Sequence, residues 1–344
     1  MRIHIGHHFW GAGNLGDDLM VAGFLTELRK LSNRPSLSCC TPFDRAALTT
    51  RFPEIEWLAY NDANRESAIR SCDVWLGLGG SPFQIRVSRW FIDHLMAERY
   101  RCNRYNRPSY FLGIGGQELL AFEDSDLRSV FERAQRVWMR DAWSLPAMKK
   151  FMPSERISPG ADLAHLVLQS HSSTAAPGRI VVTLNFDFQS WSSLPVALDA
   201  IGKINPAERV WFSQESRPLD GSEQSIWSQL PQSETRNWEP QVADNGSPSA
   251  EAILKNWPTG EWLISSRFHA CLVAMWAGSK IVVVGTNDKL RGLAEDFDLP
   301  IVDPNASSNE WNQAIASAKP VSRNRLNAAA RDAKRACAEF FASI

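Results

Sequence analysis

An arginine and a histidine stand two residues apart in the segment Ser265-Ser266-Arg267-Phe268-His269, just after a predicted buried strand. The apolar residues that follow predict a helix to about residue 277. Ser266 can cap this helix, which would place Arg267 and His269 in its first turn. Cations oppose the helix dipole there, whereas an anion is stabilised. The pattern therefore predicts an anion site, where arginine binds a carboxylate or phosphate and histidine supplies a proton.

A structural reading of the same two residues stays open. Arg267 can instead form an ion pair with a nearby glutamate, and His269 can be a core histidine whose hydrogen bonds are satisfied. Neither of these roles requires a ligand.

A carboxylate stands at the predicted start of the first helix. The run Asn14-Leu15-Gly16-Asp17-Asp18 follows a glycine-rich stretch, and the helical pattern indicates a start at Asp17. Asp17 is suited to cap that helix by accepting backbone N–H bonds. It can also face a ligand cleft and take a proton from a hydroxyl group. The two roles are compatible, and both stay open.

The same region, from Gly11 to Gly16, fits the dinucleotide-binding pattern G-x-G-x-x-G. That motif needs its first glycine at the end of a strand that opens directly into a helix. Here residues 7–10 intervene, and Thr41-Pro42-Phe43 stands at the end of the second strand, where an acidic residue would bind the ribose. A nicotinamide or flavin cofactor is therefore not expected.

Other predicted strands also end in glycine or polar residues. Each signal alone is weak, because such residues more often form tight turns. In doubly wound sheets, however, ligands bind at the carboxyl ends of the strands. Together the signals predict one crevice, lined by Gly79, Gly80, Gly115 and Gly116 from the first half of the chain and by Gln214, Arg217 and Lys289 from the second.

Buried apolar segments alternate with helical patterns on both sides of a linker-like stretch near residues 169–178. Strands are predicted at residues 2–6, 36–40, 73–78, 110–114, 136–139, 180–185, 208–213, 261–265, 280–284 and 300–302. In the first half, helices are predicted at about 17–31, 88–101, 123–134 and 142–151. This alternation predicts an α/β protein with two Rossmann-like lobes in a GT-B-like arrangement around a central cleft. The predicted domains are an N-terminal lobe at 1–168 on the acceptor side, a C-terminal lobe at 179–320 on the donor side, and a C-terminal helix at 321–344 packing at the lobe junction.

Composition narrows the class of protein. The formal net charge of −1 offers no electrostatic footprint for nucleic acid or an anionic membrane. The six cysteines are scattered without a Cys-x-x-Cys pair, which fits reduced thiols in the cytoplasm better than disulfides or a zinc site. We find no signal peptide and no apolar run of the roughly 18 residues that a membrane span needs. The fourteen tryptophans are expected mainly in the core, although exposed indoles can also stack on sugars.

Taken in order, these motifs resemble the polysaccharide pyruvyl transferase family over roughly residues 3–300. Residues 267–270 are similar to its R-x-H-A signature, residues 14–18 to its N-x-G-D-E segment, and residues 140–144 to its R-D-x-x-S segment. The glycine pairs at 79–80 and 115–116, the Pro-Gly-Ala-Asp run at 159–162 and Lys289 also match in position.

The resemblance implies that pyruvate is transferred from phosphoenolpyruvate onto two hydroxyls of a sugar in a glycan or glycolipid precursor, forming a cyclic ketal. It implies donor contacts from Arg267 and His269, with Ser266, Lys289, Gln214 and Arg217 in the same subsite. Asn14 and Gly16 join the cleft glycines on the acceptor side. Phosphoenolpyruvate is the co-substrate, and no other cofactor and no metal is expected. The chain departs at Asn185, where members often carry an arginine, so Arg217 or Lys289 substitutes or the donor differs.

This reading gives His269 the role of acid, which protonates the donor's methylene carbon, and Asp17 the role of base toward the sugar. Two alternatives stay open. One is a glycosyltransferase that uses a nucleotide sugar, with Glu295 or Asp296 on the ribose. The other is a non-catalytic cleft protein that binds an anionic sugar or metabolite. The acceptor, the ketal stereochemistry and the oligomeric state also stay open, and a homo-oligomer is compatible with the sequence.

Overall fold

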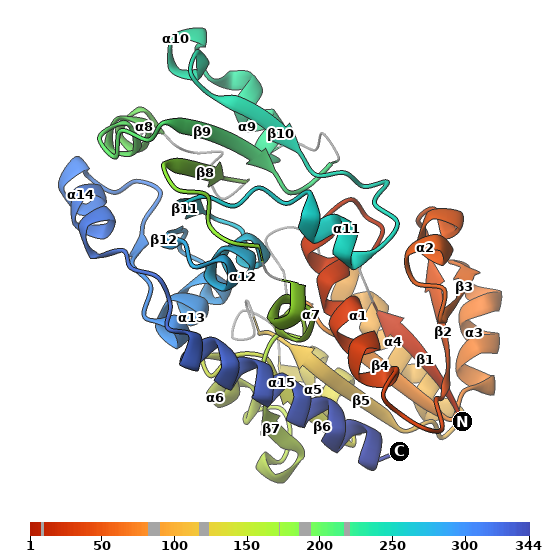
Figure 1. The fold of residues 1–344 in the computed structure, drawn as a ribbon. Helices are drawn as coiled ribbons and strands as arrows, with labels where there is room; N and C mark the ends of the chain where they lie inside the picture. The colour runs from red at the N-terminus through yellow and green to blue at the C-terminus, as the bar shows by residue number, and fades with distance from the viewer. Residues whose placement is uncertain (8–9, 82–89, 117–123, 172, 186–193, 217–220) are drawn as a thin grey trace.

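The computed structural model describes residues 1–7, 10–81, 90–116, 124–171, 173–185, 194–216 and 221–344. They form two lobes, each built on a parallel sheet with helices around it (Figure 1). Within the described residues, no helix is both long and apolar enough to cross a membrane.

Seven parallel strands form the sheet of the N-terminal lobe, in the order β3-β2-β1-β4-β5-β6-β7. They are β1 (Arg2–His7), β2 (Ser36–Thr41), β3 (Ile55–Ala59), β4 (Val74–Leu78), β5 (Ser109–Ile114), β6 (Arg136–Met139) and β7 (Ile157–Pro159). The helices of this half are α1 (Leu15–Leu28), α2 (Arg45–Arg51), α3 (Asp62–Ser71), α4 (Trp90–Arg104), α5 (Asp124–Phe131), α6 (Ser144–Met148) and α7 (Ala164–His171).

Six parallel strands form the second sheet, in the order β10-β9-β8-β11-β12-β13. They are β8 (Arg179–Thr183), β9 (Glu208–Ser213), β10 (Glu239–Val242), β11 (Trp262–Ser265), β12 (Lys280–Val284) and β13 (Ile301–Val302). The helices are α8 (Leu194–Gly202), α9 (Glu223–Gln229), α10 (Gln232–Thr235), α11 (Ala250–Lys255), α12 (Phe268–Ala277), α13 (Asp288–Phe297), α14 (Ser308–Ser317) and α15 (Arg323–Ala342).

Both sheets repeat one topology. In each, the first strand lies between the second and the fourth, so the strand order reverses between β1 and β4 and again between β8 and β11. Open α/β sheets bind ligands at this switch point, beside the carboxyl ends of the strands. Central strands such as β4 and β5 are buried along their whole length, as expected where helices cover both faces of a sheet. The prediction of two Rossmann-like lobes is confirmed.

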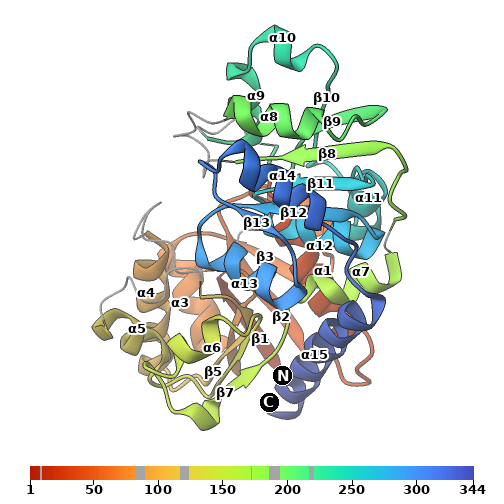
Figure 2. The ribbon, with the colours of Figure 1, turned by 90° about the vertical axis from the view of Figure 1, so that its left-hand side faces the viewer.

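The long helix α15 follows the second sheet but packs on the first lobe. It contacts α1, α7, β5 and β7, and also α12. Its buried residues recur every three or four positions, which places one apolar stripe against the lobe. Phe340 in this stripe contacts the ring of Phe24 from α1 and that of Tyr110 from β5. Figures 1 and 2 show that α15 brings the C-terminus back to the end of the lobe where the N-terminus lies.

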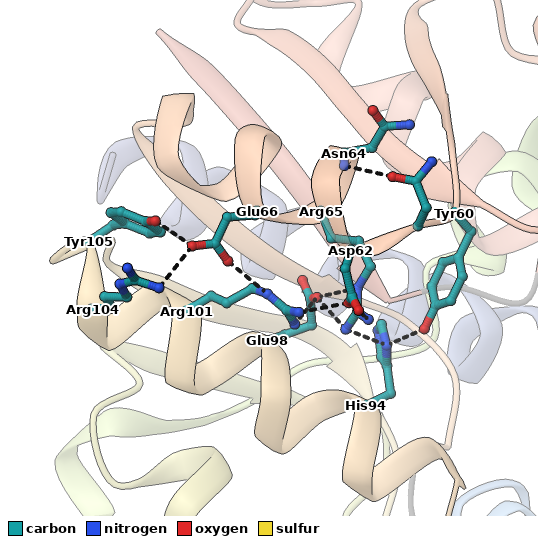
Figure 3. Close-up of polar contacts among 11 residues, drawn as sticks. Tyr60, Asp62, Asn64, Arg65, Glu66, His94, Glu98, Arg101, Arg104 and Tyr105 are labelled. Atoms are coloured by element: carbon teal, nitrogen blue, oxygen red, sulfur yellow. Dashed lines mark hydrogen bonds and ion pairs between the residues drawn. The ribbon is translucent and has the colours of Figure 1, made fainter.

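A buried polar network joins α3 and α4 (Figure 3), and His94 of this network also contacts the backbone of β1. Arg65 Nε donates to Glu98 Oε1 at 2.7 Å. The Nδ1 atom of His94 lies 2.8 Å from the Tyr60 hydroxyl and 3.1 Å from Arg65 Nη2, while Nε2 lies 2.9 Å from the carbonyl oxygen of Gly6. Because Arg65 only donates and Gly6 O only accepts, Nδ1 accepts and Nε2 carries the proton. Burial lowers the pKa of His94 to about 4, so the ring is neutral.

One arginine, next to α1, connects the two lobes. Arg51, at the end of α2, forms a buried ion pair with Asp18 of α1. Its Nε donates to the carbonyl oxygen of Ser247 at 2.8 Å, and Nη2 donates to that of Asn245. Both carbonyls belong to the segment between β10 and α11. Burial raises the pKa of Asp18 to about 6, although the charge of Arg51 opposes this.

Candidate active site at the lobe interface

His269 lies in the first turn of α12, directly after β11, the strand at the switch point of the second sheet. Arg267 is the N-cap residue of this helix and so precedes the first turn, which corrects its predicted place inside the turn. Ser266 is not the cap either. Its hydroxyl donates to Asn185 Oδ1 and accepts the Asn185 N–H, both at 2.8 Å, and so joins β11 to the end of β8.

Two carboxylates from the N-terminal lobe face the buried ring of His269. Its Nδ1 atom lies 3.7 Å from Asp17 Oδ1, and its Nε2 atom lies 3.6 Å from Asp162 Oδ2. Nε2 has no hydrogen-bond partner among the described residues. Asp17 lies on α1, which follows β1, and Asp162 lies between β7 and α7. The histidine of one lobe is therefore surrounded by acidic groups of the other.

Asp162 also binds an arginine of its own lobe. Its Oδ2 lies 3.3 Å from Arg140 Nη1, and its Oδ1 accepts the N–H of Ala164 at 2.9 Å. Burial alone would raise the pKa of Asp162. The interaction with His269, whose Nε2 lies 3.6 Å away, and the charge of Arg140 outweigh burial and hold the pKa well below its usual range. Asp162 is therefore an ionised carboxylate placed beside His269.

Arg140 connects this carboxylate to both lobes. Its Nη2 donates to the Ser81 hydroxyl at 2.6 Å, and its guanidinium lies 4.1 Å from the centre of the Phe268 ring on α12. Gly115 gives it room, since a methyl group there would lie 2.5 Å from Arg140 Nε.

Asp17 does not cap the helix α1. The helix α1 begins at Leu15 with Asn14 as its N-cap residue, so the prediction that Asp17 caps the helix is wrong. Instead Asp17 Oδ2 accepts from Asn14 Nδ2 at 3.0 Å. Burial raises the pKa of Asp17, and the charges of His269, Lys289, Arg140 and Arg267 oppose that rise. A carboxylate with a raised pKa accepts protons more readily near neutral pH.

The N-terminus of α1 approaches α12 very closely at Gly16. A methyl group on this residue would lie 2.5 Å from His269 Cβ and 2.7 Å from Gln214 Nε2. Gln214, at the end of β9, donates to Asn14 Oδ1. The structure thus brings Asn14, Gly16 and Gln214 together with His269.

Arg267 forms ion pairs with two glutamates, the structural role that the sequence analysis left open for it. Its Nε and Nη2 atoms bind the two oxygens of Glu223 at 2.6 and 2.9 Å, and Nη2 also lies 3.3 Å from Glu215 Oε2. Burial would lower the pKa of Arg267, but the charges of Glu223 and Glu215 raise it further above its usual value. The Nη1 atom makes no hydrogen bond within the described part of the chain. It is therefore the atom of this guanidinium group that could bind a ligand anion.

The remaining predicted residues lie around this cluster. Lys289 is in the first turn of α13, and its charge lowers the pKa of Asp17. Gly79 and Gly80 form the turn after β4 with positive φ angles of 66° and 77°. The N–H of Gly116 donates to Ser144 Oγ at 2.8 Å. Arg217 lies outside the described residues.

Sequence motifs alone gave no role to Arg140 or Asp162. Both follow strands of the first sheet, Arg140 directly after β6 and Asp162 three residues after β7. The rule of polar residues at strand ends, applied to these two positions, would have found them. Among the described residues, no group of three His, Cys, Asp or Glu side chains could hold a metal ion. All six cysteines are buried free thiols.

Solved structures show where this fold occurs elsewhere. HepE from Anabaena, in complex with UDP and glucose, shares 11% identity over 100% of both chains, with a TM-score of 0.63. The UDP-GlcNAc 2-epimerase of Methanocaldococcus jannaschii shares 7% over 99% of both chains, with a TM-score of 0.64. A glycosyltransferase from Rickettsia africae shares 10% over 98% of this chain and 93% of its own, with a TM-score of 0.53. At these identities the likeness establishes the fold alone, and it confirms the GT-B-like arrangement.

The sequence itself gives the narrower assignment. No curated protein matches the chain significantly. The model of the polysaccharide pyruvyl transferase family matches residues 14–288, which include Asp17, Arg140, Asp162 and His269. Because this match covers most of the chain, the predicted resemblance is confirmed, and the chain belongs to the polysaccharide pyruvyl transferase family.

Proposed function

We propose that the chain transfers pyruvate from phosphoenolpyruvate to two hydroxyls of a sugar and forms a cyclic ketal. The observation that carries this proposal is the position of His269, whose two ring nitrogens face Asp17 and Asp162 from the opposite lobe. Family membership supports the same reaction class.

His269 acts first, as the acid. The methylene carbon of phosphoenolpyruvate is electron-rich, and a proton from His269 converts it to a methyl group while C2 becomes electrophilic. The ionised Asp162 beside Nε2 stabilises the protonated ring before the transfer. A positioned acid contributes about 10²–10⁴-fold to such a step.

Asp17 then acts as the base. One sugar hydroxyl adds to C2 as Asp17 takes its proton, and the second hydroxyl displaces phosphate from the same carbon. Of the two hydroxyl protons, one restores the acid and the other leaves with phosphate. The raised pKa of Asp17 suits this role, because the carboxyl group can hold the proton between steps.

The donor anion meets three kinds of positive group in this arrangement. These are the free N–H groups at the start of α12, the ammonium of Lys289 and the Nη1 edge of Arg267. Ser266 binds the side chain and the backbone of Asn185, which stands at the position where an arginine is common in the family. Lys289, whose charge acts on Asp17, is our candidate for the group that substitutes for that arginine, and Gln214 completes the subsite.

A nucleotide-sugar glycosyltransferase is the second candidate. The specific observation in its favour is that Glu295 and Asp296, suited to bind a ribose, line a hollow between the lobes. Thermal-shift titration with phosphoenolpyruvate and with UDP-glucose separates the two, because a ligand at 100 times its dissociation constant adds about 2.7 kcal/mol to stability. Stabilisation by UDP-glucose alone would favour the glycosyltransferase.

The direct test is the variant His269→Gln. Glutamine keeps some hydrogen bonding but cannot donate a proton in this step, so turnover should fall by about 10²-fold or more while the melting temperature changes little. Phosphate release from phosphoenolpyruvate is followed with a panel of galactosides and mannosides as acceptors. The control is His171→Gln, an exposed histidine on α7. Substantial turnover by a stable His269→Gln protein would remove this residue from the mechanism.

A further inference from the structure

The hollow that Glu295 and Asp296 line at the lobe interface lies between α6 and α13. It has a volume of about 520 Å³, and its lining includes Trp143, Ser144 and Lys150 from the N-terminal lobe and Asp288, Glu295 and Asp296 from α13. The mechanism proposed above uses none of these side chains. The volume is in the range of pockets that bind small molecules.

Trp143 is the unusual member of this lining. Among the tryptophans whose side chains the structure describes, it is the one classed as exposed, with 42% of its surface accessible. The Cβ atom of Trp143 packs closely against Gly292 of α13. A methyl group on Gly292 would lie only 3.0 Å from Trp143 Cβ. Trp143 also borders a neighbouring hollow of about 550 Å³, lined in part by Arg291 and Ile301. The residue thus lines both hollows while its Cβ stays packed against α13.

The polar groups around Trp143 are mainly carboxylates. The lining of this hollow includes three carboxylates, Asp288, Glu295 and Asp296, and one ammonium group, that of Lys150. Among the described residues, the Glu295 side chain makes no hydrogen bond or ion pair, and the Asp296 side chain accepts one long bond of 3.4 Å from the Ala142 N–H. Carboxylates accept hydrogen bonds from hydroxyl groups, whereas they repel anions.

From this combination we infer that the hollow is a binding subsite for an uncharged pyranose of the acceptor glycan. The apolar face of a pyranose would stack on the Trp143 indole, and its hydroxyls would donate to Glu295 and Asp296. The excess of carboxylates disfavours uronic acids, sugar phosphates and nucleotide diphosphates. A neutral sugar is the ligand class that satisfies both the aromatic face and the charge.

The lining of the subsite includes sequence neighbours of the candidate active site. Asp288 in the lining precedes Lys289, whose charge acts on Asp17. Gly116, also in the lining, follows Gly115, which packs against Arg140. We therefore propose that the adjoining part of a glycan held at Trp143 extends toward His269 and Asp17. The assignment of this sugar to the acceptor glycan rests on the proposed function. The binding of a neutral sugar, however, can be measured without phosphoenolpyruvate.

The test measures the binding of methyl glycosides of galactose, mannose, glucose and N-acetylglucosamine by saturation-transfer NMR and calorimetry, with no phosphoenolpyruvate present. Trp143→Ala should weaken the best ligand at least tenfold, while Trp143→Tyr retains most of the binding because it keeps an aromatic face. The matched control is Tyr100→Ala, which removes an aromatic side chain that is 69% exposed on α4. Circular dichroism melting checks that each variant is folded.

The charge of the sugar gives an independent test. Methyl glucuronide should bind the wild-type protein more weakly than methyl glucoside, and Glu295→Gln should narrow that difference. Equal binding of neutral sugars to folded Trp143→Ala and to the wild type would overturn the inference. So would the absence of binding of every methyl glycoside to the wild type, or UDP binding that depends on Trp143. A failure to release phosphate from phosphoenolpyruvate would instead count against the proposed function and leave these binding results standing.

Discussion

At the scale of single residues, the charges near His269 are nearly balanced. Arg267 is paired with two glutamates, and Arg140 is paired with Asp162. Because these carboxylates already neutralise the two arginines, the arginines attract a donor anion only weakly. The N–H groups that begin α12 are positive groups that an anion can still use there.

Three of the candidate site residues could be selected from the sequence, but their partners could not. Arg267, His269 and Asp17 stand out because each follows a strand or begins a helix. The pairing of Arg267 with Glu223 joins residues 44 positions apart, and that of His269 with Asp162 joins the two lobes. No local pattern encodes such pairs, since they arise only when the sheets are assembled.

His94 gives a prediction for pH. Its pKa is about 4 in the folded protein and near 6.5 when unfolded, so the unfolded chain binds more protons between these values. Stability should therefore be lost as the pH falls from 6.5 toward 4, by about 3 kcal/mol for this group. Asp18, whose pKa is raised to about 6, acts in the opposite direction over part of this range.

The variant His94→Gln isolates this contribution of His94. Urea unfolding at several pH values between 7 and 4.5 should show a flatter pH dependence than in the wild type, whatever the absolute stability of the variant. The exposed His171→Gln variant should keep the wild-type slope. An unchanged slope in His94→Gln would show that His94 is not the group that senses acid.

At the scale of elements, the site is made by two helix N-termini that meet. The helices α1 and α12 each follow a strand at a switch point, one in each sheet. The strands missed in the sequence are β3 and β10 at the sheet edges and the short β7, which is an edge strand too. Edge strands alternate or expose their side chains, as β10 does, and so lack the continuous apolar run that marks a central strand.

Gly16→Ala tests the contact between these helices. Alanine is favoured over glycine inside a helix by up to about 1 kcal/mol, so the fold of α1 should not suffer. Its methyl group would collide with His269 Cβ and Gln214 Nε2, which forces α1 and α12 apart. Turnover should fall at least tenfold with the melting temperature nearly unchanged. Gly202→Ala is the control, because a methyl group at this helical glycine of α8 meets nothing within 4 Å.

At the scale of the whole molecule, Arg51 links the lobes outside the site. Arg51→Ala leaves the buried Asp18 without its partner and frees two carbonyls of the segment before α11. Loss of one member of a buried ion pair costs about 3–5 kcal/mol. Chemical denaturation should show this loss, and hydrogen exchange should become faster at residues 243–249.

The control for Arg51 is a pair of the same type on the surface. Arg29 binds Glu54, but 46% of the Arg29 side chain is accessible, so Arg29→Ala should cost less than about 1 kcal/mol. Equal losses in Arg29→Ala and Arg51→Ala would contradict the view that Arg51 joins the lobes.

The return of α15 to the first lobe has a consequence for synthesis on the ribosome. The stripe that ends at Phe340 covers α1 and β5, which are translated more than two hundred residues earlier. Until α15 has left the ribosome, the emerging first lobe must expose the apolar surface around Phe24 and Tyr110. Nascent chains that lack residues 321–344 should therefore recruit chaperones and stay sensitive to protease, and they should become resistant only after α15 has emerged. The second lobe, whose sheet is complete at β13, should acquire its protection earlier than the first.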